Sequence, residues 1–311
     1  MNPLSLTYGA LSYARNLLFD TGFFSAHLQG PVVSVGSISA GGAGKTPLVI
    51  RLGELLKARQ APFDVLSRGY GRKSKGVRLV RVNGEPDEFG DEPLLIARRL
   101  GVPVVVGENR YHAGLLAEQK FGPQLHLLDD GFQHRALARD FDVVLFTARE
   151  NSDRLLPVGR LREPLASLER ADAIVLVNNT ELPGVQLKPG AFVWRVRRKT
   201  VLESPTLRPL AFCGIARSEQ FFAELRELGV STDAEIAFPD HHAYSEADVE
   251  RLLATAREKS ADGFITTEKD LINLGPLVKA LQPLVTAKVE IELEEAEAAV
   301  SMLLEAISAR G

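Results

Sequence analysis

Short apolar runs recur along the first half of the chain, and helical segments lie between several of them. Residues 46–57, for example, place four leucines at helical spacing. Apolar runs of this length that alternate with helices are typical of parallel strands covered by helices on both faces of a sheet. The expected strands are residues 31–35, 63–67, 102–106, 125–128, 141–146 and 173–177.

A change of composition follows in the middle of the chain. Residues 178–209 contain four prolines, little helical spacing and a strand-like stretch at 194–199. Beyond them the alternation resumes, with a helix at 218–228, a strand at 263–267 and a closing helix at 294–309. The pattern therefore predicts a second, smaller α/β unit that a β-ribbon joins to the first.

The N-terminal segment is apolar, but it resembles neither a signal peptide nor a spanning helix. Between residues 2 and 30 the only formal charges are Arg15 and Asp20. No basic start precedes a compact apolar core, and no run approaches the ~18 apolar residues that a spanning helix requires. Several leucines and a tyrosine share one helical face, so the segment is either an interfacial membrane helix or a helix packed on the body.

Composition narrows the class of protein. A chain of 311 residues is long enough for two α/β units, since domains cluster near ~100–200 residues. Its net charge of −3 argues against a general nucleic-acid binder. Cys213 is the only cysteine, which excludes an internal disulfide, and the six histidines show no metal-ligand spacing. These features fit a cytoplasmic protein.

The loop between the first expected strand and the helix that follows reads SAGGAGKT. A glycine-rich loop before a helix N-terminus surrounds an anion with backbone N–H groups. Lys45 is then expected to reach the β- and γ-phosphates of a nucleotide, and Thr46 to ligate Mg²⁺. Ser39 stands where the pattern has glycine but removes no donor; a plain turn is the alternative. The expected nucleotide-binding residues are Ser39, Ala40, Gly41, Gly42, Ala43, Gly44, Lys45 and Thr46.

The phosphate loop makes the first unit a predicted P-loop NTPase-like α/β/α sandwich. We therefore expect an α/β chain in four parts. These are an apolar helix in residues 1–30, a nucleotide-binding unit in 31–190, a β-ribbon linker in 191–209, and a smaller α/β unit in 210–311.

Carboxylates follow the expected strand at 125–128. Asp129 and Asp130 stand where such folds place the acid that holds Mg²⁺, although Asp-Asp-Gly is also common turn chemistry. Asp91 and Glu92 begin a predicted helix, where they either cap the helix or take part in the chemistry.

Two further stretches are rich in titratable side chains. Residues 238–244 read FPDHHAY, and a histidine pair in such a loop is either structural or catalytic. Between Arg68 and Arg81 lie six basic residues and no acidic one. This run is either a solvated hairpin or a binding site for an anionic headgroup or sugar phosphate.

Seven motifs follow one another between Gly36 and Asp270. They read GSISAGGAGKTP, SRGYGR, GDEP, LDDGFQHRAL, LREP, FPDHHAY and TTEKD. Together they resemble the tetraacyldisaccharide 4'-kinase family, the lipid A 4'-kinases. The resemblance implies ATP- and Mg²⁺-dependent transfer of the γ-phosphoryl group to the 4'-hydroxyl of tetraacyldisaccharide 1-phosphate, which gives lipid IVA. It also implies two α/β/α domains joined by a β-ribbon, with the nucleotide between them, so that the smaller domain (210–311) closes over the site. It implies peripheral association with the cytoplasmic face of the bacterial inner membrane, with residues 1–30 as the membrane-interface helix. It implies neither a protein partner nor a nucleic acid.

The same resemblance implies roles for individual side chains. Asp91 is the expected base for the 4'-hydroxyl, and His241, from the second unit, is its partner. Lys45 and Arg162 are expected to stabilise the phosphoryl group in transfer. The expected metal-site residues are Thr46, Glu92, Asp129 and Asp130. The expected substrate-binding residues are Arg72, Gln133 and His134.

Two other classes of function remain open. A kinase or ligase that acts on a small soluble metabolite shares the phosphate loop and the acids, and it predicts full activity without lipid. A non-catalytic nucleotide switch is disfavoured, because residues 177–181 read VNNTE where guanine-reading loops carry N-K-x-D.

Overall fold

The structure, a computed structural model, describes residues 3–20, 25–42 and 44–309. Its strands form one sheet, in the order β10-β9-β11-β12-β8-β7-β6-β1-β5-β2-β4-β3. The pairs β12–β8 and β3–β4 are antiparallel, and the other pairs are parallel. The chain is therefore an α/β protein built on one large, mostly parallel sheet. The apolar pattern predicted the α/β class and the parallel strands, but not that the sheet continues through both units.

The elements alternate along most of the chain. The strands are β1 (Val32–Ser37), β2 (Phe63–Ser67), β3 (Arg78–Leu79), β4 (Val104–Val106), β5 (Leu125–Asp129), β6 (Phe141–Phe146), β7 (Ala173–Val177), β8 (Phe192–Val201), β9 (Pro209–Cys213), β10 (Ala234–Ala237), β11 (Gly263–Thr267) and β12 (Leu284–Leu293). The α-helices are α1 (Pro3–Asp20), α2 (Lys45–Ala58), α3 (Pro86–Phe89), α4 (Asp91–Leu100), α5 (Arg110–Phe121), α6 (Ser218–Glu227), α7 (Glu246–Lys259), α8 (Glu268–Leu274) and α9 (Ala296–Ser308).

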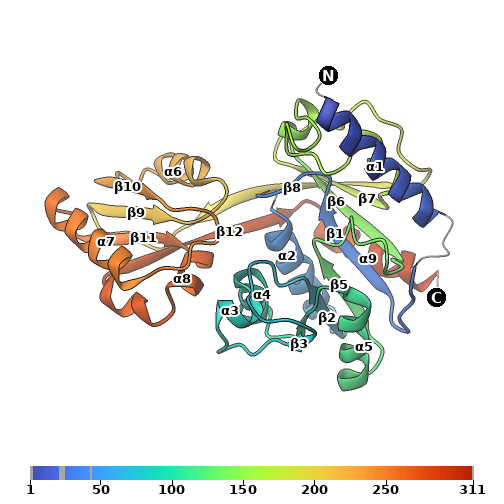
Figure 1. Ribbon diagram of the computed structural model, residues 1–311, viewed down its shortest axis with the longest axis horizontal. Coiled ribbons are helices and arrows are strands. Elements are labelled where there is room, and N and C mark those ends of the chain that lie inside the picture. The colour runs from blue at the N-terminus through green and yellow to red at the C-terminus, as the bar shows by residue number, and fades with distance from the viewer. Residues whose placement is uncertain (1–2, 21–24, 43, 310–311) are drawn as a thin grey trace.

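Two lobes are joined by β8 and β12 (Figure 1). The first lobe contains β1–β7 with α1–α5 and α9, and the second lobe contains β9–β11 with α6–α8. Strand β12 pairs with β11 at residues 284–287 and then with β8 at residues 288–293. The sequence placed the connecting ribbon in residues 191–209 alone, whereas its second strand comes from β12, far along the chain.

Alternate side chains of the central strands enter two different cores. Val143 and Leu145 of β6 pack in the core that contains α2, whereas Val144 and Phe146 pack on the opposite face of the sheet. Successive side chains of a strand point to opposite faces, so a strand that is covered on both sides must be apolar almost throughout. This geometry explains why the parallel strands read as short apolar runs.

The last helix, α9, belongs to the first lobe. Its Val300, Leu303 and Ile307 pack in the same core as Val33 and Leu48. The ribbon brings the chain back from the second lobe before α9 begins. The prediction that residues 210–311 form the second unit throughout is therefore wrong for α9, because helical spacing shows an apolar face but not which sheet that face covers.

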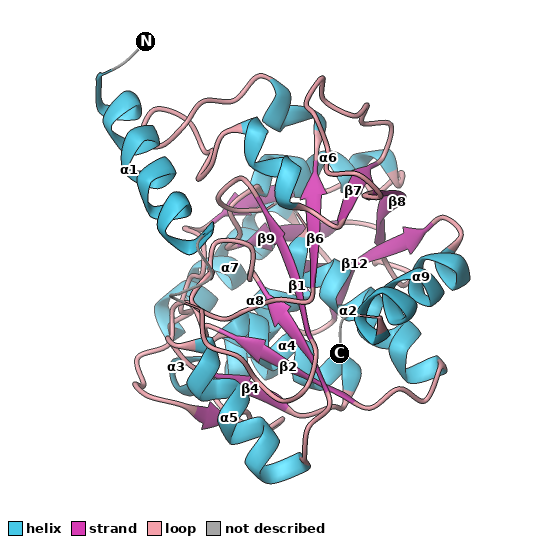
Figure 2. Cartoon of the chain, turned by 90° about the vertical axis from the view of Figure 1, so that its right-hand side faces the viewer, coloured by secondary structure: helices cyan, strands magenta, loops and turns pink. Residues whose placement is uncertain are grey.

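Helix α1 lies at the edge of the first lobe (Figure 2). On one side its Tyr8 donates a hydrogen bond to the backbone carbonyl of Arg162 (3.2 Å). On another side Leu17 and Leu18 are 48% and 57% exposed. The helix thus packs on the body and also presents apolar side chains to solvent. None of the described helices is long and apolar enough to cross a membrane.

A buried charged cluster ties the segment after α1 to the start of the sheet. The Nδ1 of His126 lies 2.8 Å from the Asp64 carboxylate, and both residues are fully buried. The carboxylate of Glu118 accepts the backbone N–H of Gly30 at 2.8 Å and lies 3.4 Å from His126 Nε2. Burial lowers the pKa of His126, but the two carboxylates outweigh burial and raise it.

We predict that His126 makes stability depend on pH. Because its folded-state pKa is raised, its contribution is fully present below the unfolded pKa of ~6.5 and is lost as pH rises through the folded pKa. His126→Gln should lower the free energy of unfolding by at least ~1 kcal/mol at pH 6. The loss should shrink at pH 9. Urea denaturation at both values, with exposed His27→Gln as control, measures this; a loss that does not change with pH contradicts it.

Candidate active site

A cleft of about 770 Å³ lies between the two lobes. The first lobe lines it with the phosphate loop and with the carboxyl ends of β2 and β5. The second lobe adds residues from three of its segments, among them Arg217, His241 and Lys269. Ligands of open α/β sheets bind outside the carboxyl ends of the strands, so this cleft is the expected place for a substrate.

The loop from β1 to α2 has the backbone conformation of an anion cradle. Gly41, Gly42 and Gly44 have φ of 69°, 60° and 98°, a region that favours glycine. Ser39 does not face the cradle, because its Oγ donates to the buried carboxylate of Glu150 at 2.5 Å. The residue that departs from the glycine pattern thus anchors the loop. Ala43, expected among the nucleotide-binding residues, lies outside the described residues.

Asp130 forms ion pairs with two cationic side chains, those of Lys45 and Arg162, beside the phosphate loop. Its carboxylate lies 3.3 Å from Lys45 Nζ and 2.8 Å from Arg162 Nη1. Burial alone raises the pKa of Asp130, but Lys45 and Arg162 outweigh it and hold the pKa below its ordinary value. Asp130 therefore orients the two cations that the sequence assigned to the phosphoryl group.

Asp129 has a different environment. Ser67 donates to its Oδ2 at 3.1 Å, whereas its Oδ1 is buried and has no hydrogen-bond partner in the described part of the chain. Burial, together with the carboxylates of Glu92 and Asp130, raises the pKa of Asp129 to about 7. An unpartnered buried carboxylate oxygen beside other oxygen donors is suited to a divalent cation. Thr46 is buried at the start of α2, on the same cleft wall.

A hydrogen bond between the two lobes joins Asp91 to His241. His241 Nδ1 lies 2.8 Å from Asp91 Oδ2, although the residues are 150 positions apart. The other oxygen of Asp91 accepts the backbone N–H of Glu92 at 2.8 Å. Asp91 is thus both the first residue of α4 and the partner of a histidine from the second lobe. The hydrogen bond to Asp91 raises the pKa of His241 against the opposing effect of burial.

Helix α8 supplies two more groups to this contact. Lys269 Nζ lies 3.1 Å from Glu92 Oε1 and 3.9 Å from Asp91 Oδ2. Asn273 donates to Asp91 Oδ2 at 3.2 Å. Burial raises the pKa of Asp91, but His241, Lys269 and Asn273 outweigh it and lower the pKa. Neither α8 residue was expected from the sequence. The available signal was that Lys269 belongs to the TTEKD motif and that Asn273, four residues later, lies on the same helix face.

Of the three expected substrate-binding residues, two line the cleft and one does not. Gln133 and His134 line the cleft. Burial and nearby arginines, Arg110 first, lower the pKa of His134 to about 4, so its ring is neutral at physiological pH. Its Nε2 accepts the backbone N–H of Arg110 at 3.3 Å. Arg110, which also lines the cleft, was missed because nothing in its local sequence marks it.

Arg72 does not line the cleft. Its guanidinium is buried and binds Glu108 at 2.8 Å. Other basic residues of the run from Arg68 to Arg81 pair with Asp87 and Glu88. Four of the six basic residues of this run are therefore paired with carboxylates that lie outside it in sequence, which reduces the expected positive field.

The fold and the cleft have the features of α/β phosphotransferases, which hold a nucleotide between a glycine-lysine loop and strand-end acids. A family model described as tetraacyldisaccharide-1-P 4'-kinase matches residues 1–308. The chain therefore belongs to the tetraacyldisaccharide 4'-kinase family, a family of kinases in lipid A biosynthesis, as the ordered motifs predicted.

Individual relatives agree with this assignment. The tetraacyldisaccharide 4'-kinase of Koribacter versatilis is 48% identical over 321 residues, which cover 100% of this chain and 99% of that protein. The Aquifex aeolicus enzyme is 38% identical and covers 94% of each chain. A crystal structure of the Aquifex aeolicus protein in complex with ATP has a TM-score of 0.79 at 35% identity, covering 98% of each chain.

We predict that Asp91 and His241 act as one unit. Asp91→Ala and His241→Ala should each lower kcat by at least ~10², with little change in ATP affinity. The double variant should be scarcely worse than the more damaged single variant, because residues that act together are non-additive. Steady-state kinetics on the lipid acceptor measure this.

The second lobe offers a matched control. His242 pairs with Asp248 at 3.1 Å, and neither residue lines the cleft. His242→Ala should leave kcat close to the wild-type value. If the losses at Asp91 and His241 multiply in the double variant, the two residues act independently and Asp91 is reduced to a helix-terminal residue.

Proposed function

We propose that the protein transfers the γ-phosphoryl group of ATP to the 4'-hydroxyl of tetraacyldisaccharide 1-phosphate, which gives lipid IVA. The observation that carries the proposal is the Asp91–His241 pair, held at 2.8 Å across the cleft that contains the phosphate loop. In this proposal the first lobe is a P-loop NTPase-like sandwich that binds the nucleotide. The second lobe is a smaller α/β domain, joined to the first by the β8–β12 ribbon, and it completes the site.

The phosphate loop fits the nucleotide. The solved Aquifex aeolicus structure contains ATP. Here three glycines of the loop have positive φ, and α2 begins directly after Gly44, so backbone N–H groups and a helix N-terminus can meet the phosphates. Lys45 and Arg162 then stabilise the charge on the phosphoryl group in transfer, and Asp130 keeps both cations in place until the nucleotide binds.

The acidic edge of the cleft fits Mg²⁺. The unpartnered Oδ1 of Asp129 favours Asp129 over Asp130 as the more direct ligand, because Asp130 is occupied by two cations. Thr46 and Glu92 are the other residues that would hold the ion. When bound, Mg²⁺ neutralises phosphate charge and orients the transferring group.

Asp91 is the base in this proposal. A carboxylate with a lowered pKa is a weak base, so it acts only when it is held against the acceptor hydroxyl and oriented by its neighbours. His241 and Asn273 provide that orientation from the second lobe. As the loose transition state forms, the proton of the 4'-hydroxyl passes to Asp91. The 4'-oxygen attacks the γ-phosphorus of ATP, and ADP leaves. Gln133 and His134 are proposed to contact the sugar.

The acceptor's acyl chains stay in the bilayer, so the protein must work at the membrane surface. We infer that α1 provides peripheral contact with the cytoplasmic face of the inner membrane. Its Tyr8, Ser12 and Arg15 line the cleft, while Leu17 and Leu18 are exposed. A helix that lies beside the site and exposes apolar side chains can therefore bind the lipid interface without leaving the body of the protein.

Removal of the loop lysine tests the phosphoryl-transfer proposal. Lys45→Ala should lower turnover at least ~10³-fold, because charge stabilisation of the transferring group is lost. The assay is transfer from radiolabelled ATP to the lipid disaccharide 1-phosphate in mixed micelles, with exposed Lys120→Ala as control. If the Lys45→Ala variant keeps a tenth of wild-type turnover, Lys45 does not stabilise the phosphoryl group in transfer. Full wild-type activity on a soluble sugar alone would favour a metabolite kinase.

The exposed leucines of α1 test the membrane proposal. Leu17→Ser combined with Leu18→Ser should weaken binding to phospholipid vesicles at least ~10-fold, since each buried leucine contributes ~1.5–3 kcal/mol. ATP affinity should stay unchanged. Co-sedimentation with vesicles measures this, and Leu207→Ser, at a residue 90% exposed in the second lobe, is the matched control. Equal vesicle binding by wild type and the α1 variant contradicts the role of α1.

A further inference from the structure

Arg217 reaches the phosphate loop from the opposite lobe. It lies in the loop between β9 and α6, and its Nη2 is 3.4 Å from the carbonyl oxygen of Gly41. A Cβ added at Gly42 would lie 2.6 Å from Arg217 Nε. The guanidinium therefore covers the loop's glycines closely enough that a larger residue at position 42 would collide with it.

The charge of Arg217 has no carboxylate partner in the described part of the chain. Its Nε is buried and makes no hydrogen bond there, and the 3.4 Å contact with Gly41 is long. Three arginines act on it as like charges, namely Arg149, Arg160 and Arg198. A half-buried cation among other cations, with unused donors, is the environment of an anion-binding residue.

The carboxylate of Glu150, which raises the pKa of Arg217 against burial, is already engaged by other groups. Glu150 acts electrostatically on Arg217 but forms no ion pair with it. Its Oε1 accepts the Ser39 hydroxyl at 2.5 Å, and its Oε2 accepts the backbone N–H of Thr147 at 2.7 Å. Glu150 is thus committed to the anchoring of the phosphate loop and leaves the guanidinium donors of Arg217 available.

Backbone hydrogen bonds connect the loop that carries Arg217 to the second-lobe segments that carry His241 and Asp270. Gly214, three residues earlier, donates its N–H to the buried carboxylate of Asp270 at 2.8 Å. The carbonyl of Gly214 accepts the N–H of His241 at 3.1 Å. Asp270 also accepts the hydroxyl of Tyr244 at 2.8 Å. The loops that carry Arg217 and His241 are therefore positioned together.

We propose that Arg217 is a second-lobe ligand of the nucleotide's phosphates. It extends from the smaller lobe over the loop at Gly41 and Gly42, and its free donors bind phosphate oxygens once the nucleotide occupies the cleft. Through Gly214 the same contact holds His241 in register with Asp91. This inference rests on the proposed nucleotide site and adds to it a charged contact that joins the two lobes.

The test measures binding without turnover. Equilibrium titration without lipid acceptor compares adenosine, ADP and ATP for wild type, Arg217→Ala and Arg217→Lys. Arg217→Ala should weaken ATP and ADP ~10–100-fold, the range for hydrogen bonds to charged groups, and leave adenosine affinity unchanged. Arg217→Lys should recover part of the loss, because the charge remains but the planar donor fork does not.

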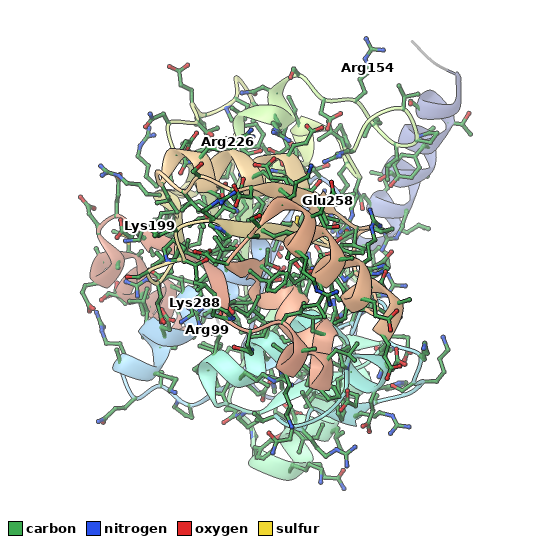
Figure 3. All side chains as sticks on the ribbon, turned by 90° about the vertical axis from the view of Figure 1, so that its left-hand side faces the viewer. Arg99, Arg154, Lys199, Arg226, Glu258 and Lys288 are labelled. Atoms are coloured by element: carbon green, nitrogen blue, oxygen red, sulfur yellow. The ribbon has the colours of Figure 1, made fainter. Side chains whose placement is uncertain are left out.

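Arg226→Ala is the matched control, since Arg226 lies on α6, the helix that directly follows Arg217, at the surface of the second lobe (Figure 3). Unchanged ATP affinity in Arg217→Ala overturns the inference, as does an equal loss for adenosine and ATP, which indicates a purely structural role. If Arg217→Ala does not fold, Arg217→Gln, which keeps the stem, is compared in the same series. A wild-type protein that fails to bind ATP contradicts the proposed function itself.

Discussion

The contact between Asp91 and His241 is the constraint on which the site depends. The two groups come from different lobes, and each has an environment that favours its charged form. A carboxylate that must accept a proton from a sugar hydroxyl gains little from its own basicity, so its position decides whether it works. The antiparallel pairing of β8 with β12 supplies that position, because it sets one lobe against the other.

Two adjacent carboxylates, Asp129 and Asp130, have different surroundings and are therefore proposed to have different roles. Asp130 is held by Lys45 and Arg162 and stays ionised, whereas Asp129 is buried with one free oxygen and has a raised pKa. Such a division is a common way for one short segment to serve two chemical roles. In this protein Asp129 is suited to a divalent metal ion, whereas Asp130 is suited to holding the side chains of Lys45 and Arg162. In the proposed mechanism, nucleotide binding separates Lys45 and Arg162 from Asp130.

The sequence predicted the elements that a local pattern determines. It did not predict the contacts made by segments that lie far along the chain. Apolar runs identified the parallel strands, because burial on both faces requires them, and the loop ending in Lys45 marked the cleft. The second ribbon strand and the placement of α9 were missed, since spacing shows a buried face but not its partner. Lys269 and Arg217 were missed for the same reason. The resemblance to a family supplied Asp91 and His241, which composition and spacing left open.

The charged pair of His241 with Asp91 can be measured directly in solution. The chain has six histidines, so NMR titration of the imidazole signals can follow His241 individually. We predict a pKa for His241 above the ordinary value of ~6.5 in the wild type and a lower pKa in Asp91→Asn, because the hydrogen bond to Asp91 is the largest influence that raises it. A His241 pKa that is the same in both proteins would contradict the pairing and, with it, the role of the second lobe in the site.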